Sequence, residues 1–333
     1  MKQFDDLIAR AQSAPKHIVL AEGQDPRVVD GAVRALQEKV ATVTLLGPID
    51  EVRALARAAG DTEDQLHIVD PQQAAKHDAY AAEFFEIRKH KGLNLSTAQN
   101  AVKNPLNYAN MMVRTGDADG SVAGARNTTG NVVLSALQVI GVDKRYSLVS
   151  SFFLMMMCED FHTKKGGVVF ADCGLVVAPD EDELAQIAAA AADSARLLLN
   201  VDPKIAMLSF STRGSAQHPD VTKVENAAAR VRELRPDLSV EPAIQFDAAF
   251  VPEIAALKAP ESEVAGNANV FVFPDLNSGN IGYKIAERIG RAKAIGPIMQ
   301  GLAKPANDLS RGCDADAVYG MIAVTVVQAQ TAA

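Results

Sequence analysis

The sequence contains no tryptophan and only three cysteines in 333 residues. Cys158, Cys173 and Cys313 form no C-x-x-C pair, which argues against a disulfide framework or a structural zinc site and favours a reducing compartment. No run approaches the roughly 18 consecutive apolar residues of a membrane span, and the N-terminal segment lacks the apolar core of a signal peptide. We therefore expect a cytoplasmic protein.

Basic charge is also scarce. The formal net charge is -8, which argues against a general nucleic-acid or membrane-surface binder, because such proteins need spread basic surface. Hydrophobic residues make up 48% of the chain and charged residues 22%, so it can bury sizeable cores. The length favours two domains over one. An anionic ligand would therefore need a local basic pocket.

Several well-known motifs are missing as well. The chain has neither the G-x-x-x-x-G-K-[ST] loop nor the G-x-G-x-x-G fingerprint, which weakens nucleoside triphosphate hydrolysis and Rossmann-type dinucleotide binding. No G-x-S-x-G elbow exists, so a hydrolase of that type is disfavoured. The segment "GDADGS" resembles the start of a calcium loop, but the position of the bidentate carboxylate falls on Thr128. We interpret it as a turn.

What the sequence does contain is an alternation of short apolar runs and helical runs. Strands are expected at Ile18–Leu20 and in residues 41–48 and 66–71, with a helix entered at Asp25 or Pro26. Residues 71 to about 108 have a helical pattern, and a helix is expected from about Thr129 to Ile140. Four further strands are predicted within residues 146–157, 166–177, 204–212 and 269–276. This pattern is typical of an α/β fold with mostly parallel sheets, and the domain boundary lies near residues 141–147.

The segment "PANDLSRGCDADAVYGMIAVT" carries more polar groups than a helix start requires. Asp314 or Asp316 can cap the apolar helix that follows. The additional side chains of Asn307, Asp308, Ser310 and Arg311 suggest that the loop holds a ligand.

Two other loops follow predicted strands. After residue 208 come Ser211, Thr212 and Arg213, which suit a phosphate, although hydroxyls also cap helices without any ligand. His218 in the same loop could act as an acid or base, but a loop histidine before a proline is more often simply exposed. The segment "PDLNSGNIGYK" places small residues before a helix, where backbone N-H groups favour an anion. Together these loops predict a site for a bulky, phosphate-bearing ligand in a cleft between two α/β domains.

The sequence also resembles the phosphate acetyl/butyryltransferase family from "IVLAEGQDPRV" to the C-terminus. The similarity is densest in "EIRKHKGLN", "NPLNYANMMVRTGDADGSVAGA", "VFADCGL", "IAMLSFSTRGSAQHPDVTKV", "IQFDAAFVPEIA", "KAPESEVAGNANVFVFPDLNSGNIGYKIAERIG" and "AIGPIMQGLAKPANDLSRGC". Seven blocks in order over most of the chain are far more specific than any single motif.

The resemblance implies reversible acetyl transfer, in which acetyl-CoA and phosphate give acetyl phosphate and CoA. It implies CoA as a substrate, no metal or other cofactor, and a homodimer. The implied fold is isocitrate/isopropylmalate dehydrogenase-like, with two α/β domains around a cleft. Residues 1–146 with 297–333 are expected to form the first domain, and residues 147–296 the second.

The resemblance also implies roles for individual residues. Ser310 falls on the family's Ser beside the CoA sulfur and the reacting carbonyl, and Arg311 falls on the Arg that binds the phosphoryl or carbonyl oxygens. Arg88 matches a second substrate-binding cation, and Asn280 is expected to orient ligands from the facing domain. Asn307 belongs to the same motif as Ser310.

Two positions depart from the family pattern. The family's acidic residue after "SRG", proposed as the base for the CoA thiol, aligns with Ala317, and the chain offers Asp316 one position earlier. One step along a helix rotates a side chain by about 100°. A family Arg aligns with Leu134, and Arg126 is expected to supply a compensating charge.

Three alternatives stay open. One is a phosphate butyryltransferase, for which a larger acyl pocket is expected. The departures at Leu134 and Ala317 motivate a second, a catalytically weak acyl-CoA sensing module of the kind fused to malic enzymes. The third, a decarboxylating dehydrogenase, needs paired acidic metal ligands near a Lys and a Tyr, which the sequence does not assemble.

Overall fold

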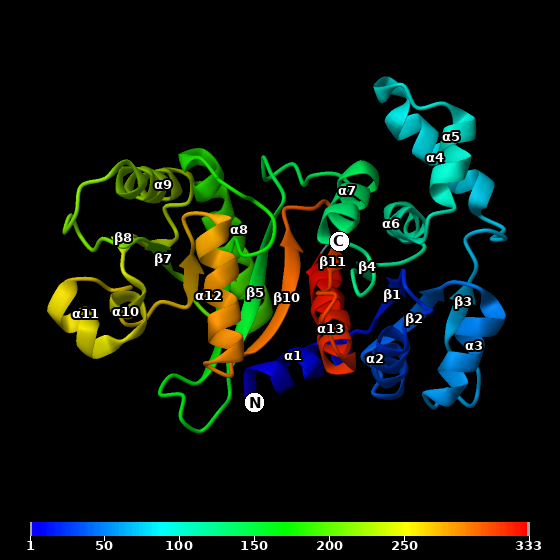
Figure 1. Cartoon of the computed structure of the whole chain (residues 1–333), viewed down its shortest axis with the longest axis horizontal. Coiled ribbons are helices and arrows are strands. Elements are labelled where there is room, and N and C mark those ends of the chain that lie inside the picture. Colours follow the sequence, from blue (N-terminus) through cyan, green and yellow to red (C-terminus); the bar gives the residue numbers. More distant parts are fainter. Residues whose placement is uncertain (1, 332–333) are drawn as a thin grey trace. The chain divides into compact units, whose positions relative to one another are not determined.

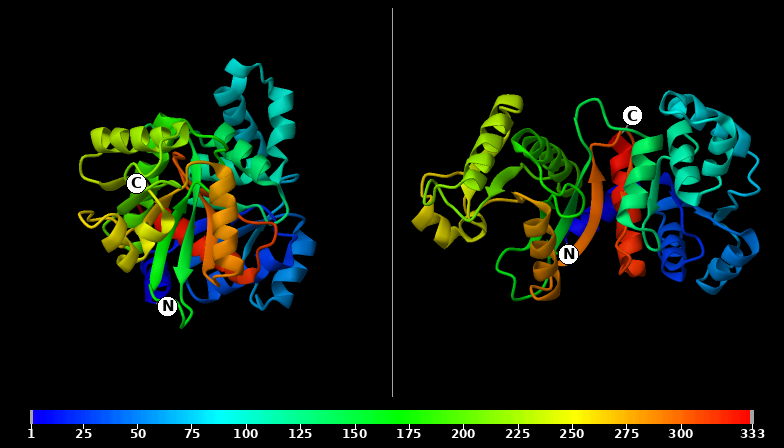
Figure 2. Two further views of the ribbon diagram at one scale, coloured as in Figure 1. Left: turned by 60° about the vertical axis from the view of Figure 1, so that its left-hand side comes forward. Right: turned by 45° about the horizontal axis from the view of Figure 1, so that its top comes forward.

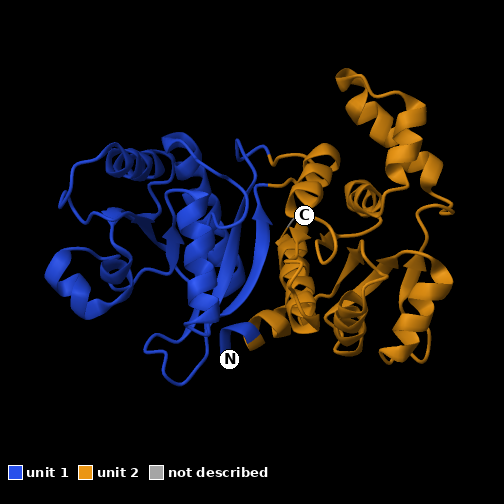
Figure 3. Cartoon of the chain, in the orientation of Figure 1, with its two compact units in different colours: residues 1–4, 144–301 blue, residues 5–143, 302–333 orange. Residues whose placement is uncertain are grey.

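The computed structural model describes residues 2–331, in which helices alternate with strands along most of the chain (Figure 1). The chain forms two compact units (Figure 3). One comprises Lys144–Gly301 together with the first residues up to Phe4. The other comprises Asp5–Asp143 and the segment from Leu302 onward. Each unit has its own sheet.

The second of these units contains a five-stranded sheet in which every described pair is parallel. Its strand order is β11-β4-β1-β2-β3. The strands are β1 (Lys16–Leu20), β2 (Ala41–Leu46), β3 (His67–Val69), β4 (Gly120–Ala123) and β11 (Ala306–Asp308). The carboxyl ends of parallel strands share one edge, so the loops after β1, β4 and β11 emerge beside one another.

The unit with the five-stranded sheet also contains helices. They are α1 (Lys2–Ser13), α2 (Pro26–Gln37), α3 (Ile49–Ala58), α4 (His77–Arg88), η1 (Lys89–Lys91), α5 (Leu95–Val102), α6 (Pro105–Thr115), α7 (Thr129–Val139) and α13 (Ala315–Thr331). The last helix is hydrophobic on most sides, and it is buried along its length beside α2 and the sheet (Figures 1 and 2). A helix that is apolar all round needs such cover, which explains why the C-terminal segment packs inside this unit.

The other unit has a six-stranded mixed sheet in the order β10-β5-β6-β9-β7-β8. Strands β5 and β10 run antiparallel, side by side, and β6, β9, β7 and β8 are parallel (Figure 2). The strands are β5 (Ser150–Met157), β6 (Gly166–Ala171), β7 (Lys204–Leu208), β8 (Ser239–Ile244), β9 (Val270–Val272) and β10 (Lys293–Gln300). The helices are α8 (Glu181–Leu199), α9 (Pro219–Leu234), α10 (Phe246–Phe250), α11 (Pro252–Lys258) and α12 (Leu276–Arg288).

The predicted α/β class and mostly parallel sheets are confirmed. Asp25 caps α2 and Pro26 opens it, as the sequence predicts. The polar segment before Ser310, however, is not entirely a loop. Asn307 and Asp308 belong to the buried strand β11, whose short length and polar composition hid it.

Candidate active site

The loop from Leu309 to Cys313 connects β11 to α13. It emerges next to the loop after β4, because β11 and β4 are parallel neighbours. Ser310 and Arg311 are both exposed on it. The Gly312 amide donates to Ser310 Oγ at 3.2 Å, and the Arg311 guanidinium has no hydrogen-bond or ion-pair partner within residues 2–331. The two side chains that are predicted to be catalytic are therefore accessible to a ligand.

The backbone of this loop, in contrast, is held firmly by Arg27 on α2. Arg27 Nη1 donates to the carbonyl oxygens of Arg311 and Cys313, each at 2.9 Å. Its Nη2 donates to the carbonyl oxygen of Ala125, at 3.0 Å, in the loop after β4. Nε and Nη2 also bind the two carboxylate oxygens of Asp25, and these bonds lower the pKa of Asp25. One guanidinium thus links both loops and the start of α2.

Glu22, which follows β1, holds the loop after β4 from another side. Its carboxylate accepts hydrogen bonds from the backbone N-H groups of residues 124 to 127, at 2.7–2.9 Å, and from the Asn127 side chain. Four successive amides converging on one anion form the kind of concavity that binds phosphate in other proteins. Here an internal carboxylate occupies it.

Asp308 lies between these two loops and is completely buried. Its Oδ2 accepts from Thr129 Oγ1 at 2.7 Å, whereas Oδ1 has no hydrogen-bond partner within residues 2–331. Burial, together with the nearby charge of Glu22, raises the pKa of Asp308 to about 7. A Cβ at Gly124, whose φ is +112°, would lie 2.1 Å from Asp308 Oδ1. Only glycine therefore fits at this point of the loop.

Asp316 occupies the first turn of α13, one residue before Ala317. Asp314 caps the helix, and Asp316 Oδ1 pairs with Arg34 Nη1 at 2.8 Å. Arg34 also binds Glu38 and lies over the ring of Tyr319. The Asp316 side chain is 63% exposed, so the ion pair leaves it open to solvent.

Asn307 is buried, unlike Ser310 and Arg311. Its side-chain amide donates to Thr325 Oγ1 and Gln328 Oε1 on α13. These bonds attach β11 to the helix, which explains the residue without a ligand. Substrate contact by Asn307 stays a prediction that its position does not favour.

Two further predicted cations line cavities in the same unit. Arg88, at the end of α4, lines a cavity of about 250 Å³ together with Lys91 and Asn107. Arg126 lines another, of about 450 Å³, that is described further below. Leu134 lies on α7 and is 54% exposed, so the position where the family has an Arg presents an apolar side chain to solvent.

The residues predicted after β7 have partners within their own unit. The Ser211 side chain is completely buried and accepts from the Ala216 amide. Thr212 Oγ1 is bonded to Gln245, and Arg213 forms an ion pair with Glu241 at 2.9 Å. These contacts account for the polar side chains of the loop without any bound ligand. Phosphate binding by Ser211, Thr212 and Arg213 stays a prediction that the contacts do not favour.

Asn280 lies in the first half of α12 and is half-buried. Its Nδ2 donates to the Cys173 carbonyl at 3.0 Å, and its Oδ1 accepts from Lys284. The preceding Gly279 packs directly on the backbone of Asp172, where a Cβ would lie 2.2 Å from the carbonyl oxygen. The small residues of this segment therefore serve close packing between α12 and the end of β6.

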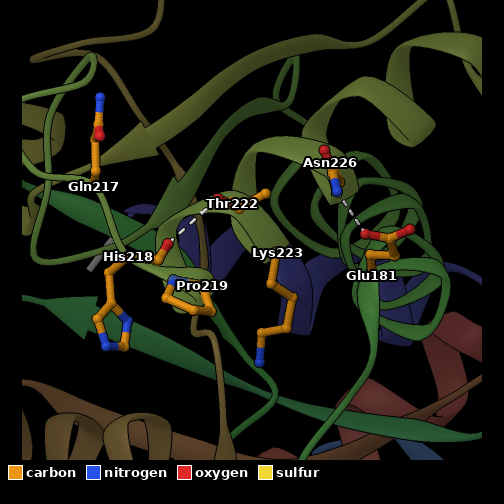
Figure 4. A pocket seen from close by; sticks show the side chains of 7 residues that line it. All are labelled: Glu181, Gln217, His218, Pro219, Thr222, Lys223 and Asn226. Atoms are coloured by element: carbon orange, nitrogen blue, oxygen red, sulfur yellow. Dashed lines mark hydrogen bonds between the residues drawn. The ribbon is translucent and has the colours of Figure 1, made fainter.

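His218 caps α9 with its ring, since Nδ1 accepts from the Asp220 amide at 3.2 Å. It lines an open pocket with Lys223 and Asn226, in which Asn226 donates to Glu181 (Figure 4). Lys223 donates to the Pro274 carbonyl. None of the predicted site residues other than His218 lines this pocket, and the cap explains His218.

Sequence reasoning missed Glu22 and Arg27, although both lie in the segment "AEGQDPR" at the end of β1. The signal available was an acid and an arginine around a predicted strand-to-helix turn, the usual place for ligand-facing loops.

All three cysteines are free thiols, and burial raises the pKa of Cys313. No group of three or more potential metal ligands occurs in residues 2–331. Within the same range, no helix has the length and apolar character needed to span a bilayer.

Comparison with known proteins identifies the family. The model of the Phosphate acetyl/butaryl transferase family matches residues 3–326. The Phosphate acetyltransferase of Clostridium acetobutylicum is 45% identical over 320 residues, 96% of each chain, and that of Paracoccus denitrificans is 45% identical over 328 residues, 98% of this chain and 99% of the relative. A crystal structure of a phosphotransacetylase from Streptococcus pyogenes has a TM-score of 0.92 and 44% identity, and the match covers 99% of this chain and 98% of that one. The chain therefore belongs to the Phosphate acetyl/butaryl transferase family.

Proposed function

We propose that this chain is a phosphate acetyltransferase, which transfers an acetyl group reversibly between CoA and inorganic phosphate. The family match spans nearly the whole chain, and relatives of about 45% identity carry that activity in their names. The observation that carries the proposal is the loop after β11. Ser310 and Arg311 are exposed there, while Arg27 holds the backbone between them and α13.

The residues of this loop take the following roles. In the direction of acetyl-CoA synthesis, the CoA sulfur attacks the acetyl carbonyl of acetyl phosphate, a carbon–sulfur bond forms, and the bond from carbon to the phosphate oxygen breaks. Arg311 binds the phosphoryl or carbonyl oxygens and stabilises the oxyanion that develops. The Ser310 hydroxyl lies beside the sulfur and carbonyl. Asp316, which is exposed in the first turn of α13, accepts the thiol proton as the general base.

Other residues are proposed to bind the substrates. Arg88 binds a phosphate group of the substrate with help from Lys91, which lines the same cavity. Arg126 supplies a further cation. Asn280 orients ligands. Ser211, Thr212 and Arg213 act mainly through the packing of their own loop, and Asn307 acts mainly by attaching β11 to α13.

The wider properties follow from the family. We propose CoA or acetyl-CoA with phosphate or acetyl phosphate as substrates, and no metal or other cofactor. We also propose a cytoplasmic homodimer that binds neither nucleic acid nor membrane. Domains of residues 1–146 with 297–333 and of residues 147–296, arranged around a cleft as in isocitrate/isopropylmalate dehydrogenases, stay predictions. Light scattering of the purified chain tests the dimer.

The test is the rate of thioester formation from CoA and acetyl phosphate, with butyryl phosphate in parallel and no added metal. We expect fast turnover with the acetyl substrate and a loss of at least about 100-fold in Ser310→Ala and Arg311→Ala. Arg57→Ala is the matched control, because Arg57 is an exposed arginine of α3 that pairs with Asp64 and has no proposed role in the site. Wild-type turnover in both loop variants would refute the assignment, and preference for butyryl phosphate would favour the butyryl alternative. Acetyl-CoA binding without turnover would favour the sensing module.

A further inference from the structure

A cavity of about 450 Å³ lies at the carboxyl ends of β1, β2 and β3. It is lined by the residues that follow each of these strands and by Arg126 and Asn127 after β4. Lys103 and Pro105, at the start of α6, close another side. Ser310 and Arg311 are not among the lining residues, so the proposed catalytic loop does not account for this cavity.

The cavity lies at the point where the strand order of the sheet reverses. The chain runs outward from β1 through β2 to β3, and it then returns to place β4 on the other side of β1. The strand order therefore reverses between β1 and β4. In open parallel sheets, ligands bind in the crevice outside the carboxyl ends of the strands at this reversal point. The cavity is lined by residues after both β1 and β4, so it includes that crevice.

The acidic side chains that line the cavity have hydrogen-bond partners, whereas the basic ones do not in the part of the chain that the structure describes. The carboxylates of Glu22 and Asp70 accept hydrogen bonds from backbone and side-chain N-H groups. The side chains of Lys103 and Arg126 have no acceptor within residues 2–331. The amides of residues 124–127 are already occupied by Glu22, so an anion entering the cavity would be bound by the two side-chain cations instead.

The remaining lining combines apolar and polar side chains, the latter including Gln24, Gln72 and Asn104. Leu46, Pro48, Pro71 and Pro105 contribute aliphatic surface with few hydrogen-bonding groups. A volume of about 450 Å³ lies within the range of small-molecule sites and is much larger than a single phosphate needs. Two cations without acceptors, beside aliphatic side chains and side-chain amides, suit a ligand with a phosphate at one end and a flat ring that carries hydrogen-bonding groups at the other.

We propose that this cavity binds a phosphate-bearing ligand of nucleotide size, with Lys103 and Arg126 holding its phosphate groups. Two sources supply this chemistry. One is the phosphorylated adenosine end of CoA, and this version rests on the proposed function. The other is a free adenine nucleotide, which would bind independently of acetyl transfer.

The experiment uses the full chain and two measurements. Calorimetric titration with ADP tests binding directly, and KM values for CoA and for 3′-dephospho-CoA test whether the substrate itself reaches the cavity. Lys103→Gln and Arg126→Gln each remove one cation. Arg57→Gln removes an exposed arginine of the same unit outside the cavity, and Arg88→Gln removes the cation of the other cavity.

We expect wild-type chain to bind ADP with a Kd of about 1 mM or tighter. Lys103→Gln and Arg126→Gln should each weaken this binding by roughly tenfold or more, the typical value of a charge-assisted hydrogen bond, whereas Arg57→Gln should not. If CoA is the source, the KM for CoA rises in both variants and the KM for 3′-dephospho-CoA changes less. If a free nucleotide is the source, ADP binding weakens in both variants, and both KM values stay unchanged in Lys103→Gln.

The proposal is overturned if wild-type chain binds no ADP, or if only Arg88→Gln weakens it. It is also overturned if both cavity variants bind ADP as the wild type does. Turnover of CoA and acetyl phosphate is measured in the same preparations. ADP binding through Lys103 and Arg126 without any turnover would refute the proposed function and still support the cavity proposal.

Discussion

Replacing Arg27 with alanine should impair acetyl transfer without removing any group proposed to touch a substrate. Arg27 donates to three backbone carbonyls, two on the proposed catalytic loop and one on the loop after β4. Its loss leaves these carbonyls and the Asp25 carboxylate without their donor. Asp25 still accepts from the backbone amide of residue 27, which retains the cap of α2. The variant should therefore fold with a displaced loop.

The expected magnitudes follow from these contacts. Hydrogen bonds from a charged donor contribute about 1.5–3 kcal/mol each when buried. The Arg27 side chain is 36% exposed, so water replaces part of what is lost, and we expect a decrease of about 3 kcal/mol in stability. A loop displacement of about 1 Å costs roughly 100-fold in rate. The effect should fall on kcat more than on KM, because the displaced groups act on the reacting atoms.

The assay compares kcat, KM and the thermal midpoint of Arg27→Ala with two controls. Arg53→Ala removes another partly buried arginine of the same unit, which binds the Leu66 carbonyl and lies near Asp61 and Asp64. It should lose stability and keep its kcat. Arg27→Lys keeps the charge but not the planar donor set, and it should recover little activity. Low concentrations of guanidinium should partly restore Arg27→Ala.

The reasoning about Arg27 is refuted if Arg27→Ala keeps kcat within about threefold of wild type. It is refuted equally if Arg53→Ala loses as much kcat at a similar loss of thermal midpoint. In that case a general loss of stability would explain both variants.

Three other predictions follow from the same region. The pKa of Asp308 rises from 3.8 to about 7 on folding, so its contribution to stability is present below about pH 4 and is lost as the pH rises towards 7. Asp308→Asn should lack this decline, which amounts to roughly 4 kcal/mol at most, and parallel thermal midpoints of both proteins from pH 4 to 8 would contradict it. Gly124→Ala should lose at least about 2 kcal/mol of stability, because its Cβ meets Asp308 at a positive φ; an unchanged thermal midpoint would count against the observed loop. Asp316→Asn should lower kcat about 100-fold with little effect on stability, since its exposed pair with Arg34 contributes at most about 1 kcal/mol; a loss below about threefold would exclude Asp316 as the base.

Much of the fold was predictable because its elements follow simple patterns. Apolar runs such as Ile18–Leu20 became buried strands, and Asp25 with Pro26 marked a helix start. The strand β11 was not predictable in this way. Its Asn307 and Asp308 are polar, and they are buried only because α13 and the loop after β4 supply partners from distant parts of the sequence.

Less of the candidate site than of the fold was predictable from the sequence pattern. The exposed pair Ser310 and Arg311 came from the resemblance to a family, and polar composition alone indicated only that the loop held a ligand. Arg27 and Glu22 could not be assigned from their spacing, since their partners lie about 100 and 280 residues further along the chain. Contacts of this range depend on the sheet order, which the sequence pattern left open.

The arginines predicted to bind substrate fall into two groups. Arg88, Arg126 and Arg311 have no carboxylate or carbonyl partner within residues 2–331, although the chain carries a net charge of -8. Arg213, in contrast, is paired with the buried carboxylate of Glu241, and this contact raises its pKa. A ligand that recruited Arg213 would have to take from the buried Glu241 carboxylate its ion-pair partner and leave it the Ser262 hydroxyl alone within residues 2–331. We therefore expect an anionic substrate to bind at lower cost to the three unpaired arginines than to the paired one.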